Sequence, residues 1–195
     1  LMVGFFNGIA IGSGVVIARH FGARDISGLQ KSIHTTTAFG LICGCVLTVV
    51  GVFAAPQILV LMGTPEAVLP NSIVYFRIYF SGSLAFVMYN FFVGILQSVG
   101  DSRHPLIYLV ISSVVNIVLD LVLIGVFHYG VGAAALATVI SQFISAFLCL
   151  FQLLRSPEEF RLSIRKICLD RNMLRQIVSN GFPAGFQNSI ISVAN

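Results

Sequence analysis

Long apolar runs alternate with short polar connections along almost the whole chain. Five such runs lie at about residues 1–18, 35–62, 73–98, 105–127 and 132–154, and a sixth begins near residue 173. The second to fifth runs each reach the roughly 20 residues that a helix needs to cross a bilayer. The pattern therefore predicts a bundle of membrane-spanning helices.

Composition supports this class. Only 9% of the residues are charged and 57% are hydrophobic, whereas an average soluble domain has roughly 25% charged residues. A water-soluble fold of this size cannot cover its surface with so few charges. The fold class is therefore predicted as an all-α integral membrane protein. The net charge of +4 does not indicate nucleic-acid binding, because no nucleic-acid-reading motif accompanies it.

Basic residues are confined to alternate connections, which predicts the topology. Cytoplasmic loops of membrane proteins carry an excess of Lys and Arg, so the connections at 19–34, 99–104 and 155–172 are predicted to be cytoplasmic. The residues assigned to this side are Arg19, Arg24, Lys31, Arg103, Arg155, Arg161, Arg165, Lys166, Arg171 and Arg175.

The last of these connections has the features of a short interfacial helix. Ser156 followed by Pro157 is a plausible helix start, and Phe160, Ile164 and Ile167 then form one apolar stripe. Such a segment is typical of a linker between two halves of a bundle, and equally of a loop lying on the membrane surface.

Two charged residues fall inside the apolar runs, Arg77 and Asp120. A charge near the bilayer centre costs about 2.5–3.5 kcal/mol on insertion scales, so each is expected to have a partner or a function. The predicted topology places Asp120 about six residues before the outer end of its helix, or ~9 Å deep.

Polar neighbours of Asp120 suggest a cation site. Ser113, Asn116 and Asp120 share one face of their helix, and Thr138 on the next helix lies at a similar depth. Ser141 or Gln142, then Ser145, continue a second polar stripe. Carboxylate, amide and hydroxyl oxygens suit a hard cation such as Na⁺, and a carboxylate shielded from water can instead carry a proton.

Structural explanations of the same residues remain open. Asp120 can simply pair with Arg77, and serines and threonines in membrane bundles more often serve packing than ligand binding. Tyr75 and the aromatic residues that follow it at helical spacing are typical of core or lipid contact.

Enzymatic function is not predicted. One intramembrane aspartate cannot form a catalytic dyad, and the histidines at 20, 34, 104 and 128 lie at helix ends or in loops without the spacing of a zinc site. Cys43, Cys45, Cys149 and Cys168 are expected to be free thiols.

Six segments, in order, resemble the multidrug and toxic compound extrusion (MATE) transporters, on the bacterial DinF-like side of that family. They are VIARHFGARD, LMGTPEAV, GDSRHPL, NIVLDLVLI, GAAALATVISQ and NGFPAGFQNS. The resemblance implies two six-helix lobes. Residues 1–154 then hold helices two to six of the N-terminal lobe, 155–172 the interlobe linker and 173–195 the start of helix seven, so that the chain is an internal fragment lacking helix one and most of the C-terminal lobe.

The resemblance also implies a function and a set of site residues. It implies a multi-pass protein of the bacterial cytoplasmic membrane that exports drugs or small, often cationic, organic compounds in exchange for Na⁺ or H⁺, with no other cofactor. By the same resemblance Asn116, Asp120 and Thr138 match the family's coupling positions and possible Na⁺ ligands, and Tyr75 matches a helix-four tyrosine near them.

Two alternatives to drug export are carried forward. One is a flippase of lipid-linked saccharides on a related fold, which a single intramembrane arginine disfavours. The other is a non-transporting membrane module in which the Asp120–Arg77 pair is structural.

Overall fold

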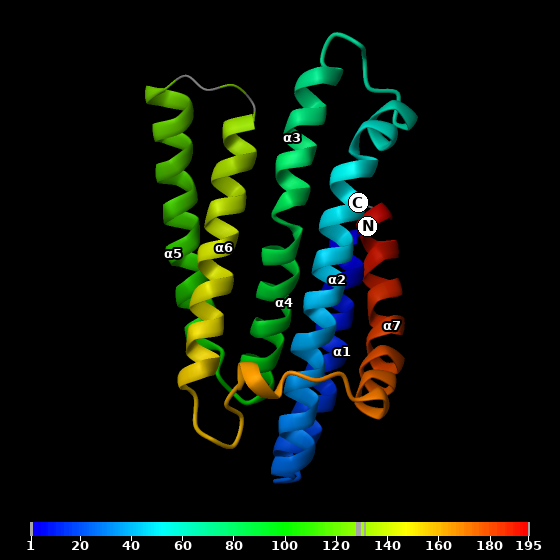
Figure 1. Cartoon of the computed structure of the whole chain (residues 1–195), viewed down its shortest axis with the longest axis vertical. Helices are drawn as coiled ribbons and strands as arrows, with labels where there is room; N and C mark the ends of the chain where they lie inside the picture. The colour runs from blue at the N-terminus through cyan, green and yellow to red at the C-terminus, as the bar shows by residue number, and fades with distance from the viewer. Residues whose placement is uncertain (1, 128–129, 131, 195) are drawn as a thin grey trace.

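The computed structural model describes residues 2–127, 130 and 132–194, and its described part contains helices and connections but no strand. His128, in the fourth connection, lies outside the described residues. The predicted all-α class is confirmed (Figure 1). The α-helices are α1 (Met2–Gly22), α2 (Ile26–Leu61), α3 (Leu69–Ser81), α4 (Ser83–Ser98), α5 (Arg103–Asp120), α6 (Gly132–Arg155) and α7 (Arg171–Ala194), with a π-helical segment η1 (Leu121–Val126) and a 3-10 turn η2 (Ile164–Lys166).

The helices run along a common long axis, with α5 at one edge and α7 at the other (Figure 1). α6 packs against α5, α4 and α3, while α2 packs against α3 and α4, and α1 against α4 and α7. Within the described residues, four helical spans are long and apolar enough to cross a membrane: Ile26–Leu61, Leu69–Ser98, Arg103–Val126 and Gly132–Arg155.

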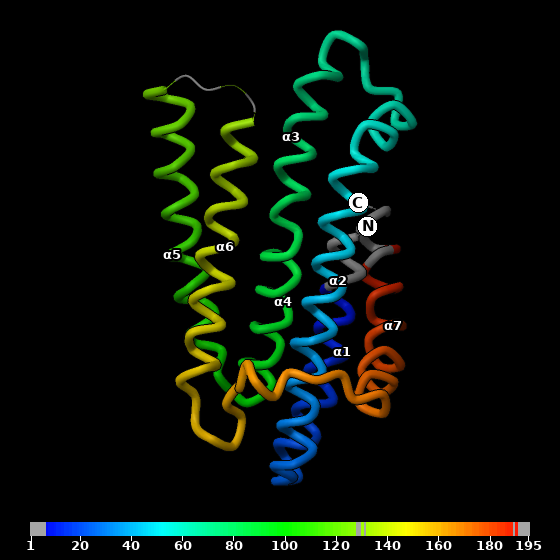
Figure 2. The backbone as a smooth tube through the Cα atoms, in the orientation of Figure 1, coloured from blue at the N-terminus to red at the C-terminus, as the bar shows by residue number. Residues whose placement is uncertain are grey.

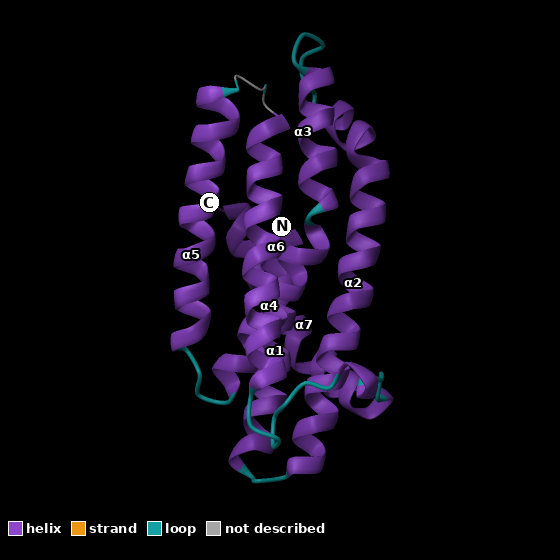
Figure 3. Cartoon of the chain, turned by 60° about the vertical axis from the view of Figure 1, so that its left-hand side comes forward, coloured by secondary structure: helices purple, strands orange, loops and turns teal. Residues whose placement is uncertain are grey.

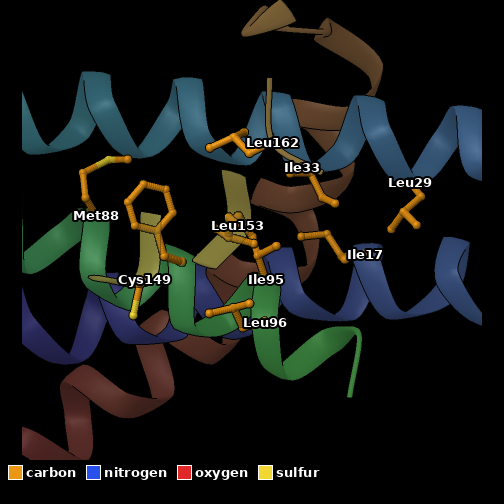
Figure 4. Packing of buried hydrophobic residues seen from close by; sticks show 10 residues of the cluster. Ile17, Leu29, Ile33, Met88, Ile95, Leu96, Cys149, Leu153 and Leu162 are labelled. Carbon is orange, nitrogen blue, oxygen red and sulfur yellow. The ribbon is translucent and has the colours of Figure 1, made fainter. Parts of the chain in front are cut away.

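The outer surface of the bundle is apolar, which is the inverse of a soluble protein. Phe53 is 75% exposed and Leu106 is 62% exposed. Large hydrophobic side chains that are exposed to this extent need to be surrounded by hydrocarbon rather than by water. The interior holds a second apolar set, in which Ile33, Ile95 and Leu153 meet (Figure 4).

The predicted helix at 73–98 is wrong in two respects, because helix begins at Leu69 and breaks at Gly82. Figure 3 shows the break as a short turn in the column formed by α3 and α4. A Cβ at position 82 would lie 2.6 Å from Val139 Cγ2, so the break coincides with a close approach of α6. The Leu84 amide donates to Thr48 Oγ1 of α2 at 3.2 Å, which supplies a partner for a backbone group next to the break.

The segment at 19–34 is mostly helical rather than a loop. α1 continues to Gly22 and α2 begins at Ile26, so the connection is reduced to residues 23–25. Asp25 explains the sharp start of α2: its carboxylate accepts from the Gly28 amide at 3.0 Å and pairs with His20 Nδ1 at 2.9 Å. These two interactions, the backbone hydrogen bond first, hold the pKa of Asp25 below its ordinary value.

The predicted interfacial helix in the linker is also wrong. Residues 157–160 form a turn and only Ile164–Lys166 is helical, as a single 3-10 turn. The Ser156 hydroxyl donates back to the Gln152 carbonyl at 2.9 Å instead of starting a new helix. The linker is pulled onto the bundle by Leu162, which is 1% exposed and belongs to the same core as Ile33 (Figures 2 and 4).

Helices α1 and α7 cross at paired glycines. A Cβ on Gly8 would lie 2.1 Å from Gly185 Cα, and one on Gly12 would lie 2.2 Å from Gly181 Cα. Because the obstructing atoms are backbone, no side-chain adjustment can relieve the overlap. This crossing depends on the absence of side chains on both helices.

Gly12→Ala is expected to lower the free energy of unfolding by about 1–3 kcal/mol, since the added methyl group forces α1 and α7 apart. Thermal unfolding in detergent measures the change. Gly22→Ala is the matched control, because a Cβ at that position meets nothing within 4 Å. Equal stability of the two variants would show that α1 and α7 do not pack at these glycines.

Acidification is expected to loosen the start of α2. A depressed carboxyl pKa contributes stability above the unfolded-state value of 3.8, and that contribution is lost as pH falls through the still lower folded-state value. The Gly28 amide resonance, followed by NMR below pH 4, should therefore shift with Asp25 protonation. In Asp25→Asn, which can cap but cannot titrate, the shift should be absent; a persistent shift would assign the transition to another group.

Candidate functional site

Asn116 and Asp120 lie one turn apart on α5 and are both half-buried. Within the described residues, only four buried side-chain polar atoms lack a hydrogen-bond partner, and two of them are Asn116 Nδ2 and Asp120 Oδ1. Buried polar atoms are nearly always paired, because leaving one unpaired costs about 1–3 kcal/mol. These two atoms without partners make this turn of α5 the candidate site.

The donor set suits a small cation or a proton. Asp120 offers a carboxylate oxygen, and rotation of the Asn116 amide by half a turn exchanges its nitrogen for its oxygen. Both oxygens are hard donors of the kind that Na⁺ prefers. Protonation of Asp120 would instead remove the charge and add one donor.

Thr138 lies on α6, which packs along α5. Its hydroxyl donates to the Ala134 carbonyl of its own helix at 3.0 Å, so the oxygen keeps its lone pairs for a cation. In the described structure, no hydrogen bond joins Thr138 to Asn116 or Asp120. The three side chains that were expected to form one cluster are therefore not linked by direct hydrogen bonds.

The second polar stripe of α6 is occupied by its own backbone. Ser141 donates to the Thr138 carbonyl at 2.8 Å, and Ser145 donates to the Gln142 carbonyl at 3.0 Å. These hydroxyls behave as packing residues of a membrane helix, and they leave Thr138 as the α6 residue of interest.

Tyr75 lies on α3, on the other side of α6 from α5 (Figure 1). Its ring stacks on Tyr79 with centroids 6.2 Å apart and lies edge-on to Phe76 at 6.1 Å. Among the described contacts none links Tyr75 to Asp120, so the structure places Tyr75 in an aromatic row rather than with the α5 pair.

The structural ion pair between Asp120 and Arg77 is not formed. Arg77 is exposed on α3, and both ion pairs found in the described part of the chain join a histidine to an aspartate. α6 packs against both α3 and α5 and separates the two charges (Figure 1). This removes the pairing on which the non-transporting alternative depended.

A feature that the sequence did not predict begins directly after Asp120. The helix changes from α to π geometry over Leu121–Val126, and the Phe127 amide donates to the Val122 carbonyl at 3.1 Å. π-helical turns occur often at functional sites, since they change the direction of side chains relative to a regular helix. Asp120 therefore lies at a junction between two helix geometries. The apolar run LVLIGV gives no sequence signal for this change.

A sequence model of the MatE family matches residues 1–122. The chain belongs to the MatE family. Members of this family are membrane transporters and not enzymes.

The four cysteines are free thiols, as expected.

Curated relatives extend the match over the whole chain. A probable multidrug resistance protein YoeA of Bacillus subtilis is 34% identical over 100% of the chain and 43% of its own length. The multidrug export protein MepA of Staphylococcus saprophyticus is 27% identical over 99% of the chain and 43% of its length. The chain thus spans about two fifths of the relatives that it matches.

Solved structures agree in fold. An inward-facing multidrug resistance MATE transporter superposes with a TM-score of 0.90 at 27% identity, over 98% of this chain and 44% of that chain. An outward-facing one superposes with a TM-score of 0.89 at 27% identity, over 99% and 44%. The chain resembles the corresponding part of both conformations almost equally well.

Asp120→Leu is expected to raise the free energy of unfolding by about 1–2 kcal/mol in Na⁺-free buffer, because it removes a buried oxygen that has no partner. The reaction of the buried Cys149 thiol with a fluorogenic maleimide during heating reports unfolding. Ser113→Leu is the control, because its hydroxyl is already bonded to the Leu109 carbonyl at 2.8 Å. A loss of stability at position 120 would mean that the carboxylate is paired in the folded protein.

Proposed function

We propose that this chain is part of a secondary transporter that exports small, often cationic, organic compounds in exchange for Na⁺ or H⁺. The observation that carries the proposal is the buried, unpartnered oxygen of Asp120 beside the unpartnered amide of Asn116. A cation or a proton supplies the partner that Asp120 Oδ1 lacks, and the Asn116 amide, rotated by half a turn, offers its oxygen to the same cation. Occupancy of the site then changes the energy of this part of the bundle.

Asp120 is the proposed coupling carboxylate, with Asn116 and Thr138 as the neighbouring oxygen donors. Thr138 contributes a hydroxyl oxygen whose hydrogen is already used by Ala134. Tyr75 has a weaker case, since its described contacts are with aromatic neighbours of its own helix. We do not extend the proposal to a flippase, because Arg77 is the single basic residue inside the apolar runs at 35–62, 73–98, 105–127 and 132–154.

The proposed cycle moves the part of the chain that belongs to the N-terminal lobe as one body. Its almost equal similarity to the inward-facing and the outward-facing structures supports a lobe that keeps its internal packing while access alternates. Cation binding at Asp120 then needs to alter only a local element, and the π-helical turn at Leu121–Val126 is the nearest irregular one. The basic connections at the ends of α1, α4 and α6 are proposed to face the cytoplasm.

The complete gene product in everted vesicles provides the test. A Na⁺ gradient or a pH gradient is applied separately, and movement of a cationic dye is followed for the wild type, Asp120→Asn and the control Ser81→Ala. We expect one gradient to drive the dye, Ser81→Ala to behave as wild type because its exposed hydroxyl donates to the Ile78 carbonyl of its own helix, and Asp120→Asn to lose gradient-driven transport while remaining folded. Normal transport by Asp120→Asn would refute the assignment of the coupling carboxylate.

A further inference from the structure

A cavity of ≈ 630 Å³ lies between the linker, the start of α2 and the end of α6. It is distant in sequence from the Asp120 site and has no part in the proposed coupling. Its lining combines three cationic side chains, Arg161, Arg165 and Lys166, with one carboxylate, Glu158, and apolar side chains that include Leu154 and Ile164.

The walls of this cavity are fixed by hydrogen bonds to α2. The Gln30 amide nitrogen donates to the Glu158 carbonyl at 2.9 Å, and the Ser163 amide donates to His34 Nε2 at 3.1 Å. His34 Nδ1 lies 2.6 Å from the Gln30 carbonyl. A carbonyl only accepts and a backbone amide only donates, so His34 carries its proton on Nδ1 and is neutral.

Two further contacts hold the linker on either side. The Leu162 amide donates to the Leu153 carbonyl at 3.1 Å, and the Asp170 amide donates to Thr35 Oγ1 at 3.2 Å. The cationic residues at 165 and 166 therefore lie on a segment that is anchored before and after them, and the cavity is preorganised rather than formed by a free loop.

The charges of the cavity do not balance. With His34 neutral, three positive side chains face a single carboxylate, and in the described residues none of the three forms an ion pair. All three are exposed residues that line the same cavity. Guanidinium and ammonium groups lining one cavity without acidic partners favour a phosphate-like anion.

The apolar part of the lining indicates where the phosphate comes from. Leu154 lies one residue before the end of α6, and Ile164 is 63% exposed at the cavity. Cations beside apolar side chains at the end of a membrane helix match the boundary between lipid headgroups and acyl chains. An inorganic phosphate ion has no apolar part that could contact Ile164, whereas a phospholipid has acyl chains next to its phosphate.

We infer that this cavity binds the phosphate headgroup of an acidic phospholipid and thereby holds the linker against the membrane surface. The geometry assigns Arg161, Arg165 and Lys166 to the phosphate and Ile164 to the start of the acyl chains. Since Leu162 anchors the same segment in the core, lipid occupancy stabilises the linker on the bundle. This inference does not depend on transport or on Asp120.

The test uses the complete gene product in detergent, with phosphatidylglycerol and phosphatidylcholine added in turn and bound lipid counted by native mass spectrometry. The variant replaces Arg161, Arg165 and Lys166 with Gln. The control replaces Lys31, Arg103 and Arg171 with Gln, which removes the same charge from exposed residues outside the cavity lining.

We expect the wild type and the control to retain phosphatidylglycerol over phosphatidylcholine, and the cavity variant to bind it roughly tenfold or more weakly. Equal loss in the cavity variant and the control would overturn the site in favour of a diffuse charge effect. Displacement of the lipid by millimolar inorganic phosphate would overturn the lipid source and leave a soluble anion as ligand.

Asp120→Asn separates this result from the transport proposal. Lipid retention by Asp120→Asn should equal that of the wild type, whether or not that variant transports. Loss of retention in Asp120→Asn would overturn the independence of the two sites, whereas failure of dye transport in the wild type would count only against the coupling proposal.

Discussion

Every backbone amide and carbonyl that enters the hydrocarbon must find its partner within the protein, and the architecture follows from this constraint. It explains why the described chain is built of helices, and it also explains what happens where a helix is interrupted. At the break beside Gly82, the Leu84 amide is taken up by the Thr48 hydroxyl of a neighbouring helix. After Asp120, the backbone changes to hydrogen bonds between residues i and i−5, as between the Phe127 amide and the Val122 carbonyl. The helix therefore continues without a break in its backbone hydrogen bonding.

The same constraint explains why the Asp120 site stands out. Most buried hydroxyls of the bundle, such as Ser13 and Thr37, donate to a carbonyl of their own helix. Such bonds make a polar residue acceptable in lipid without giving it a further function. Asp120 Oδ1 and Asn116 Nδ2 have no hydrogen bond of this kind. Of the four buried polar atoms without a partner in the described residues, these two are the pair that lies one turn apart on a single helix, which makes this turn of α5 the candidate site.

The bundle of α1 to α6 and the linker that follows it are distinct parts of the structure. Almost the whole chain superposes about equally well on inward-facing and outward-facing MATE structures. The linker crosses to α7 at one end of the bundle (Figure 2) and is held by Leu162 and His34. Its position links the core of the bundle to the helix that follows, so whatever fixes the linker also influences where α7 lies.

The sequence by itself determined the class, the number of apolar spans and the exceptional residues. Low charge and run length are sufficient for this, because a bilayer imposes a minimum length and penalises charge regardless of tertiary contacts. Asp120 was found in this way, and so was the pattern of basic connections. The family resemblance also came from ordered sequence segments, and it was confirmed by the match to residues 1–122.

Only the tertiary structure decided how those elements interact. The sequence placed Arg77 within reach of Asp120, but α6 separates the helices that carry them. It placed a helix after Ser156, but the burial of Leu162 draws that segment onto the core as a turn. The break at Gly82 lies against α6, and the cavity beside His34 is formed with the distant linker. Periodicity along one helix carries no information about such neighbours, which is why these features appear only once the bundle is assembled.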